Sequence, residues 1–121
     1  MAGTKLPLAR SSRIKQRGDF LRAKAGGERV VCGCLIANLS ARPGADSSRV
    51  GVVTSRKIGG AVQRSRARRL LREVFRLHQQ DLAHPMDVVL VARQSIAGKK
   101  LAEVERDFLQ TLRRAKLVKG S

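Results

Sequence analysis

The sequence predicts an α+β fold, with helices packed against one small sheet. Three runs rich in β-branched residues are typical of strands, at 29–39, 49–54 and 86–92. Two longer segments, 61–83 and 101–115, repeat apolar residues at helical spacing. The chain has 121 residues, of which 42% are hydrophobic, so we expect one domain with a modest core.

The first third of the chain predicts a helix followed by a strand. A short helix is expected over 17–25, closed by Gly26 and Gly27. Gly33 interrupts the apolar run 29–39, which indicates a bend or a close approach of another group. A further strand pairing near 25–30 remains an alternative, so the predicted order is α-β-β(-β)-α-β-α.

The rest of the chain predicts two strand–helix pairs. A loop containing Pro43 and Gly44 leads to the strand 49–54. Gly59 and Gly60 then separate this strand from the long helix 61–83, which His84 and Pro85 end. The run 86–92 is apolar throughout, as in a buried strand. We expect residues 1–12 to be a flexible basic N-terminus, 13–116 a single domain, and 117–121 a flexible tail.

The charge is concentrated in three segments. The formal net charge is +17, and residues 1–24, 55–76 and 99–119 carry all of it, because the remainder is balanced. Such basic regions around a neutral core indicate a surface for RNA or DNA. The densest segment, 55–76, holds eight cations and one anion. A run of this kind is costly unless a polyanion neutralises it, although a solvated basic face is the simpler alternative.

Helical phasing divides the central helix into two faces. An apolar stripe is expected to pack on the sheet, and it consists of Ala67, Leu70, Leu71, Val74 and Phe75. The opposite face is polar and basic, and it consists of Ser65, Arg68, Arg69, Arg72 and Arg76. Arg64 and Arg66 flank the first turns, where cations oppose the helix dipole. Tolerating that cost suggests an anionic ligand.

Composition argues against several other classes. No apolar run approaches the roughly eighteen residues of a spanning helix, and no signal peptide is evident. Cys32 and Cys34 are too few for a disulfide framework, and as alternate positions of one strand they should point the same way without bridging. We therefore expect a cytoplasmic protein with neither a membrane nor a disulfide-linked partner.

The basic segment resembles the signature of the bacterial ribonuclease P protein component. The matching stretch runs from Ser55 to Glu73, SRKIGGAVQRSRARRLLRE. The similarity extends to Arg13-Ile14-Lys15 with Asp19-Phe20, to Arg49-Val50-Gly51, and to the run from Asp87 to Arg93. It thus spans about residues 13–115 in the family's order.

The resemblance implies a fold, partners and sites. The fold would be a small α/β sandwich similar to the second domain of ribosomal protein S5, with an unusual left-handed strand–helix–strand crossover. The protein would assist a catalytic RNA in endonucleolytic removal of the 5′ leader from precursor tRNA. The hydrolysis would belong to the RNA and its Mg²⁺, with no protein active site. The candidate RNA-binding residues are Arg56, Lys57, Arg64, Ser65, Arg66, Arg68, Arg69, Arg72 and Arg76.

A second implied site is a cleft for the single-stranded leader. Bases would stack there on an aromatic ring while cations follow the phosphates. Its candidate residues are Arg13, Lys15, Arg17, Phe20, Lys24 and Gly33. Phe20 is as consistent with the core as with the cleft. The chain also departs from the family, because Ser65 replaces an Asn between two arginines and further cleft aromatics are missing.

The residues themselves show no catalytic set. His78 falls near the apolar stripe, His84 precedes a proline, and neither has a sequence partner for acid–base or nucleophilic chemistry. We expect Glu73 to pair with Arg69 or Arg76 along the helix. Two alternative functions remain open. One is a ribosomal or other structural RNA-binding protein, and the other is a DNA-binding regulator whose basic helix enters a major groove.

Overall fold

The computed structural model describes residues 27–116, which form one four-stranded sheet and two long helices. The strands are β1 (Glu28–Cys32), β2 (Leu35–Ala41), β3 (Arg49–Val53) and β4 (Met86–Ala92), and their order across the sheet is β1-β2-β4-β3. The long helices are α2 (Ala61–His78) and α3 (Leu101–Arg114). The predicted α+β class is confirmed. The helix expected over 17–25 and the terminal segments lie outside the described residues.

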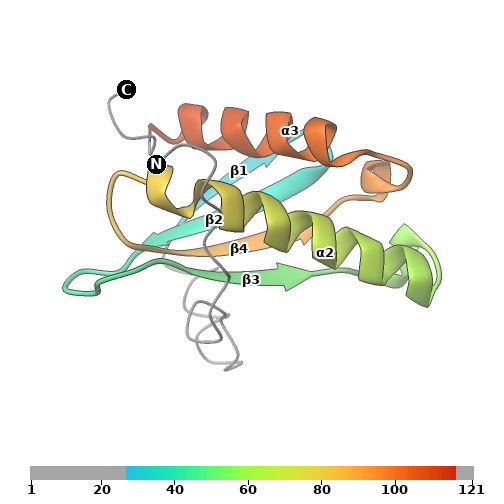
Figure 1. Cartoon of the computed structure of the whole chain (residues 1–121), viewed down its shortest axis with the longest axis horizontal. Helices are drawn as coiled ribbons and strands as arrows, with labels where there is room; N and C mark the ends of the chain where they lie inside the picture. Colours follow the sequence, from blue (N-terminus) through green and yellow to red (C-terminus); the bar gives the residue numbers. More distant parts are fainter. Residues whose placement is uncertain (1–26, 117–121) are drawn as a thin grey trace.

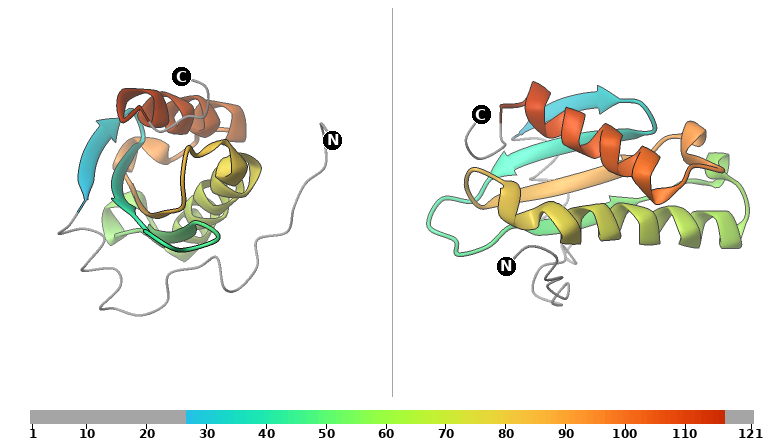
Figure 2. Two further views of the ribbon diagram at one scale, coloured as in Figure 1. Left: turned by 90° about the vertical axis from the view of Figure 1, so that its left-hand side faces the viewer. Right: turned by 45° about the horizontal axis from the view of Figure 1, so that its top comes forward.

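Both helices cover the same face of the sheet (Figures 1 and 2). β1 pairs with β2 and β2 with β4 in antiparallel fashion, whereas β3 pairs with β4 in parallel. In Figure 1, α2 lies in front of the sheet and β4 lies above β3, with both arrows pointing right. This β3–α2–β4 crossover is therefore left-handed, against the usual preference.

The core lies between the sheet and the helices. Ala67, Leu71, Val74 and Phe75 of α2 are buried, so the predicted apolar stripe is confirmed, with Leu70 half-buried at its edge. α3 buries a stripe of its own, which includes Val104, Phe108 and Leu112. These side chains pack on alternate residues of the strands, such as Leu35, Ala37 and Leu39 of β2.

The prediction of one strand over 29–39 is wrong, because Gly33 and Cys34 form a hairpin turn between β1 and β2. Gly33 adopts a φ of +57°, a left-handed conformation that favours glycine. A Cβ here would lie 2.1 Å from Oδ2 of Asp107 on α3. That oxygen also accepts a 3.0 Å hydrogen bond from the backbone N of Cys34. Asp107 thus joins the tip of the hairpin to α3.

Two further expectations need correction. Cys32 ends β1 and Cys34 belongs to the turn, so the two do not alternate along one strand; both are buried and free. α2 stops at His78 rather than near residue 83, and a 3-10 turn, Gln79–Asp81, follows it. Leu82 after this turn is buried in the core, which explains why an apolar helical pattern continues beyond the helix.

Candidate nucleic-acid interface

The basic segment occupies a 3-10 turn and most of α2. The turn, η2 (Arg56–Ile58), begins at Ser55, whose Oγ accepts a 3.3 Å hydrogen bond from the backbone N of Lys57. Ile58 is buried, whereas Arg56 and Lys57 are exposed. Burial of one turn residue thus holds the two cations at the surface, next to the start of α2.

The amino-terminal end of α2 is electrostatically unusual. Its N-cap, Gly60, provides no side-chain hydrogen bond, and no acidic residue lies in the first turn. The first N–H groups of a helix have no partner within it, and the helix dipole makes this end positive. Arg64 and Arg66 add charge of the same sign. The end of α2 is therefore suited to an anion.

α2 and α3 begin on the same side of the molecule and run in the same direction, from right to left in Figure 1. The Arg66 guanidinium donates a hydrogen bond to the carbonyl of Lys99, just before α3. Lys100 is the N-cap of α3. The positive ends of both helices and several cations thus face one side, and a polyanion would meet them together.

Arg68 is fixed between a strand and its own helix. Its Nη1 donates to Oγ1 of Thr54, just after β3, at 2.9 Å, and its Nη2 donates to Oγ of Ser65 at 3.1 Å. Arg68 therefore lies on the flank of α2 that faces β3. The prediction that it shares the outermost face is wrong in this respect. The Ser65 hydroxyl orients this arginine.

The other arginines of α2 differ in how they are held. Arg76 forms an ion pair with Glu73, with Nε 2.9 Å from Oε1, as the sequence predicted. These hydrogen bonds raise the pKa of Arg76. Arg69 is exposed and has no partner among residues 27–116. The helix thus presents both oriented guanidinium groups and one that is open to solvent.

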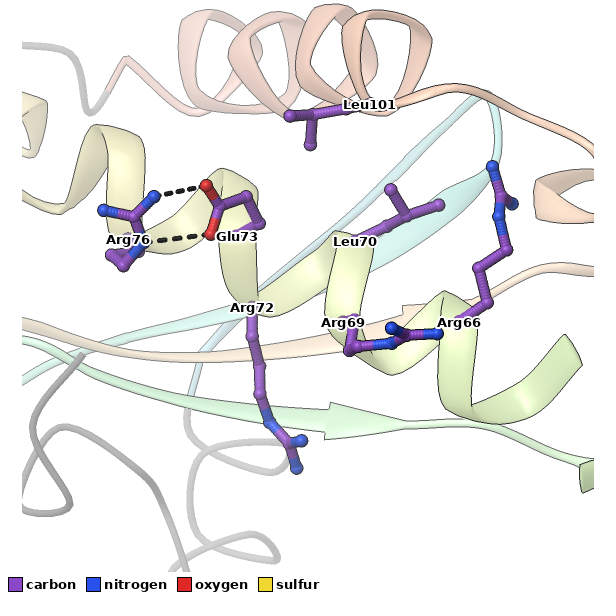
Figure 3. Close-up of a pocket in the computed structure, with 7 residues that line it drawn as sticks. All are labelled: Arg66, Arg69, Leu70, Arg72, Glu73, Arg76 and Leu101. Atoms are coloured by element: carbon purple, nitrogen blue, oxygen red, sulfur yellow. Dashed lines mark hydrogen bonds and ion pairs between the residues drawn. The ribbon is translucent and has the colours of Figure 1, made fainter. Parts of the chain in front are cut away.

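A groove of about 660 Å³ separates α2 from the start of α3 (Figure 3). We call it the α2–α3 groove, and its lining residues are Arg66, Arg69, Leu70, Arg72, Glu73, Arg76 and Leu101. Leu70 and Leu101 face one another across it, whereas Arg72 points away from Leu101. Leu101 is apolar, and Lys99 takes part through its backbone carbonyl rather than its charge, so the charge pattern indicates neither contact.

The predicted leader-binding residues are mostly not placed. Arg13, Lys15, Arg17, Phe20 and Lys24 lie outside the described residues. Gly33 is placed in the hairpin turn, where Asp107 fills the side that a Cβ would occupy. The sheet face opposite the helices carries a smaller apolar cluster, formed by Val53, Val89 and Val91.

The two histidines differ in their surroundings. His84 is exposed, as predicted. His78 lies 2.7 Å through Nδ1 from Oδ2 of Asp81 and 2.6 Å through Nε2 from Oε2 of Glu105 on α3. Burial lowers the pKa of His78, but these two hydrogen bonds outweigh it and the pKa is raised. His78 therefore ties α2 to α3.

Several other chemical features can be stated for residues 27–116. No group of three or more His, Cys, Asp or Glu side chains there could hold a metal ion. None of the helices in this part of the chain is long and apolar enough to cross a membrane. Burial, followed by a hydrogen bond to Asp107, raises the pKa of the Cys34 thiol to about 12. This cysteine is thus a poor nucleophile.

Fold and charge together define a small, basic α+β protein with one surface suited to a polyanion. The sequence profile of the Ribonuclease P family matches residues 8–116. The ribonuclease P protein component of Gluconacetobacter diazotrophicus is 34% identical over 107 residues, covering 88% of this chain and 92% of that protein. That of Dehalococcoides mccartyi is 36% identical over 108 residues, covering 89% and 88%.

Solved structures agree with these relatives. The RNase P protein of Staphylococcus aureus superposes with a TM-score of 0.79 at 27% identity, covering 88% of this chain and 97% of that one. The protein from Thermotoga maritima gives 0.74 at 27% identity, covering 84% and 96%. The chain belongs to the ribonuclease P protein component family. Its role is that of a protein subunit of this endoribonuclease in tRNA processing.

Proposed function

We propose that α2 docks this subunit onto the catalytic RNA of ribonuclease P, and that the RNA performs the hydrolysis. The observation that carries the proposal is the arrangement of α2. Its buried stripe anchors it on the sheet while its arginines line the flanks and the outer face. Arginine suits this role because its planar guanidinium binds phosphate oxygens in pairs.

The proposal assigns contacts to the described basic residues. RNA phosphates are contacted at the amino-terminal side of α2 by Arg56, Lys57, Arg64 and Arg66. Along the helix, the residues that contact phosphates or orient such contacts are Ser65, Arg68, Arg69, Arg72 and Arg76. Preorganisation supports this assignment, because Thr54, Glu73 and the Lys99 carbonyl already hold three of the guanidinium groups. A side chain that is already oriented loses less entropy on binding.

The chemistry is assigned to the RNA and its Mg²⁺. The described carboxylates do not form a ligand set for this ion: Glu73 pairs with Arg76, and Asp87 accepts two 2.8 Å hydrogen bonds from Arg49. We therefore propose that Mg²⁺ is bound by the RNA. The subunit's cations screen the repulsion between RNA phosphates, so that less Mg²⁺ is required.

The proposal further includes binding of the precursor tRNA leader, in the cytoplasm. Family membership supports it, and so does the sequence of the predicted leader-binding residues. Four of them are cations, Arg13, Lys15, Arg17 and Lys24, and the other two are Phe20 and Gly33. Cations would follow the leader phosphates, and Phe20 would supply a stacking surface.

Reconstitution tests the proposal. The full chain is added to a bacterial ribonuclease P RNA at low Mg²⁺, and cleavage of a leader-bearing precursor tRNA is measured. We expect a gain over the RNA alone and tighter binding of precursor than of mature tRNA. A chain that binds the RNA without either effect would instead be a structural RNA-binding protein. Preferential binding of duplex DNA at matched salt would favour the DNA-binding alternative.

A further inference from the structure

The α2–α3 groove combines cations with an apolar floor. Four arginines and one glutamate line it, and the glutamate already pairs with Arg76, so the groove is strongly positive. Leu70 and Leu101 are half-buried, pack on the main core, and face one another (Figure 3). A row of phosphates alone would leave this apolar surface in contact with water or charge, which is unfavourable.

Arginines surround Leu70 and Leu101 in the groove, and those at its two ends are held by acceptors. Arg66 is held at one end by the Lys99 carbonyl, and Arg76 is held towards the other end by Glu73. Arg69 lies between them and has no partner within the described part of the chain. A ligand in the groove would therefore place a negative group near Arg69 and an apolar, planar group against Leu70 and Leu101.

An unpaired nucleotide has this combination of groups. A base within a duplex is stacked and cannot offer its face, whereas an unstacked base can pack on apolar side chains or guanidinium planes. The volume of about 660 Å³ lies in the range of small-ligand sites. We propose that the α2–α3 groove receives a single unpaired nucleotide of RNA, with its phosphate on Arg69 and its base against Leu70 and Leu101.

This inference rests on the proposed docking of α2 onto RNA and adds a specific site to it. The nucleotide could come from the catalytic RNA or from the precursor tRNA, since both offer the same chemistry. The two sources are distinguished by labelling one RNA at a time in the assembled complex.

Site-directed crosslinking tests the site. Leu101→Cys carries a short photoreactive group, and the holoenzyme is irradiated with the catalytic RNA or the precursor tRNA radiolabelled. Cys32 and Cys34 are buried, so the new thiol is modified selectively, and the unsubstituted chain serves as the blank. We expect one unpaired nucleotide of one RNA to crosslink. Ala102→Cys, an exposed neighbour outside the groove, should not reach that nucleotide.

The same experiment with Arg69→Cys separates the two proposals. Crosslinking from position 69 but not from 101 overturns the nucleotide site while docking of α2 stands. Crosslinking from 101 only to paired nucleotides also overturns it. No crosslink from either position overturns both.

A substitution without charge change gives an independent measure. Leu101→Gln should weaken binding of the crosslinked RNA about fivefold, because the apolar floor is lost. The salt dependence of binding should not change, because no cation is lost. Leu109→Gln, the same change at a half-buried position on α3 outside the groove, should leave affinity unaltered. Equal affinities for Leu101→Gln and the unsubstituted chain would overturn the proposal.

Discussion

Arg68 shows how one residue gains its orientation from two hydroxyl groups. Helical phasing alone placed it with the outward-facing residues, but the end of β3 brings Thr54 within 2.9 Å of its Nη1. Ser65 supplies the second acceptor, one helical turn away. The Ser65 hydroxyl thus helps to hold the guanidinium of Arg68 in place.

We expect Ser65→Ala and Thr54→Val each to weaken binding of the catalytic RNA by roughly 0.5–1 kcal/mol, because each removes one acceptor from Arg68. In an Arg68→Ala background the same substitutions should have no further effect. Binding of the three single and two double variants to the RNA is measured at one salt concentration. Equal losses in both backgrounds would show that the hydroxyls do not act through Arg68.

The requirement for glycine at position 33 has two causes, a left-handed backbone conformation and the proximity of Asp107 on α3. Gly33→Ala should lower the free energy of unfolding by about 2–4 kcal/mol, since the left-handed φ is strained and the new Cβ meets Asp107. In an Asp107→Ala background the cost should fall to roughly 1 kcal/mol, the backbone strain alone. Denaturant unfolding of both pairs measures this difference. An undiminished cost would mean that Asp107 is not the obstacle.

The sequence predicts whether a segment is a helix or a strand better than it predicts the residues at which the segment begins and ends. The strand 86–92 and the start of α2 at residue 61 are confirmed, because a continuous apolar run and a glycine pair mark them clearly. The apolar pattern predicts one strand where the structure has the hairpin at Gly33, because the pattern continues through the two-residue turn. It also predicts a longer α2 than the structure has, because Leu82 returns to the core after the helix has ended.

For the candidate RNA-binding site, the sequence predicts the cations but not the groups that hold them. Charge and phasing identified the cations of α2 from sequence. Their fixed acceptors, Thr54 and the Lys99 carbonyl, depend on how β3 and the start of α3 pack beside α2. Leu101 falls within the predicted helix 101–115, and its helical spacing gives no indication of a groove beside α2. Contacts between elements that are far apart in the chain leave no pattern in the local sequence from which they could be predicted.

His78 joins the two helices in a manner that depends on pH. Because its pKa is raised in the folded state, its stabilising contribution is complete below the ordinary value of 6.5 and is lost as the pH rises through the raised value. The difference in unfolding free energy between the unsubstituted chain and His78→Gln should therefore be larger at about pH 5.5 than at about pH 8.5. A difference that grows with pH would contradict the tie to Asp81 and Glu105.

In the molecule as a whole, the fold determines where the positive charge of α2 is displayed. The sheet holds α2 and α3 on one face, and both helices begin on the same side (Figure 1). The apolar stripe of α2 packs inwards, so its cations are displayed on a rigid support. The eight cations and one anion of residues 55–76 are thus gathered on a surface that suits a polyanion.

The most direct test is the salt dependence of binding to the catalytic RNA. Arg69 is suited to it, because it is exposed and partnerless among the described residues, so that truncation removes little except charge. Arg113→Ala, an exposed arginine in the last turn of α3, is the control. We predict that Arg69→Ala lowers affinity and reduces the slope of log affinity against log salt by about 0.9, the value for one phosphate contact, whereas Arg113→Ala changes neither. An unchanged slope and affinity for Arg69→Ala would contradict docking of the RNA on α2.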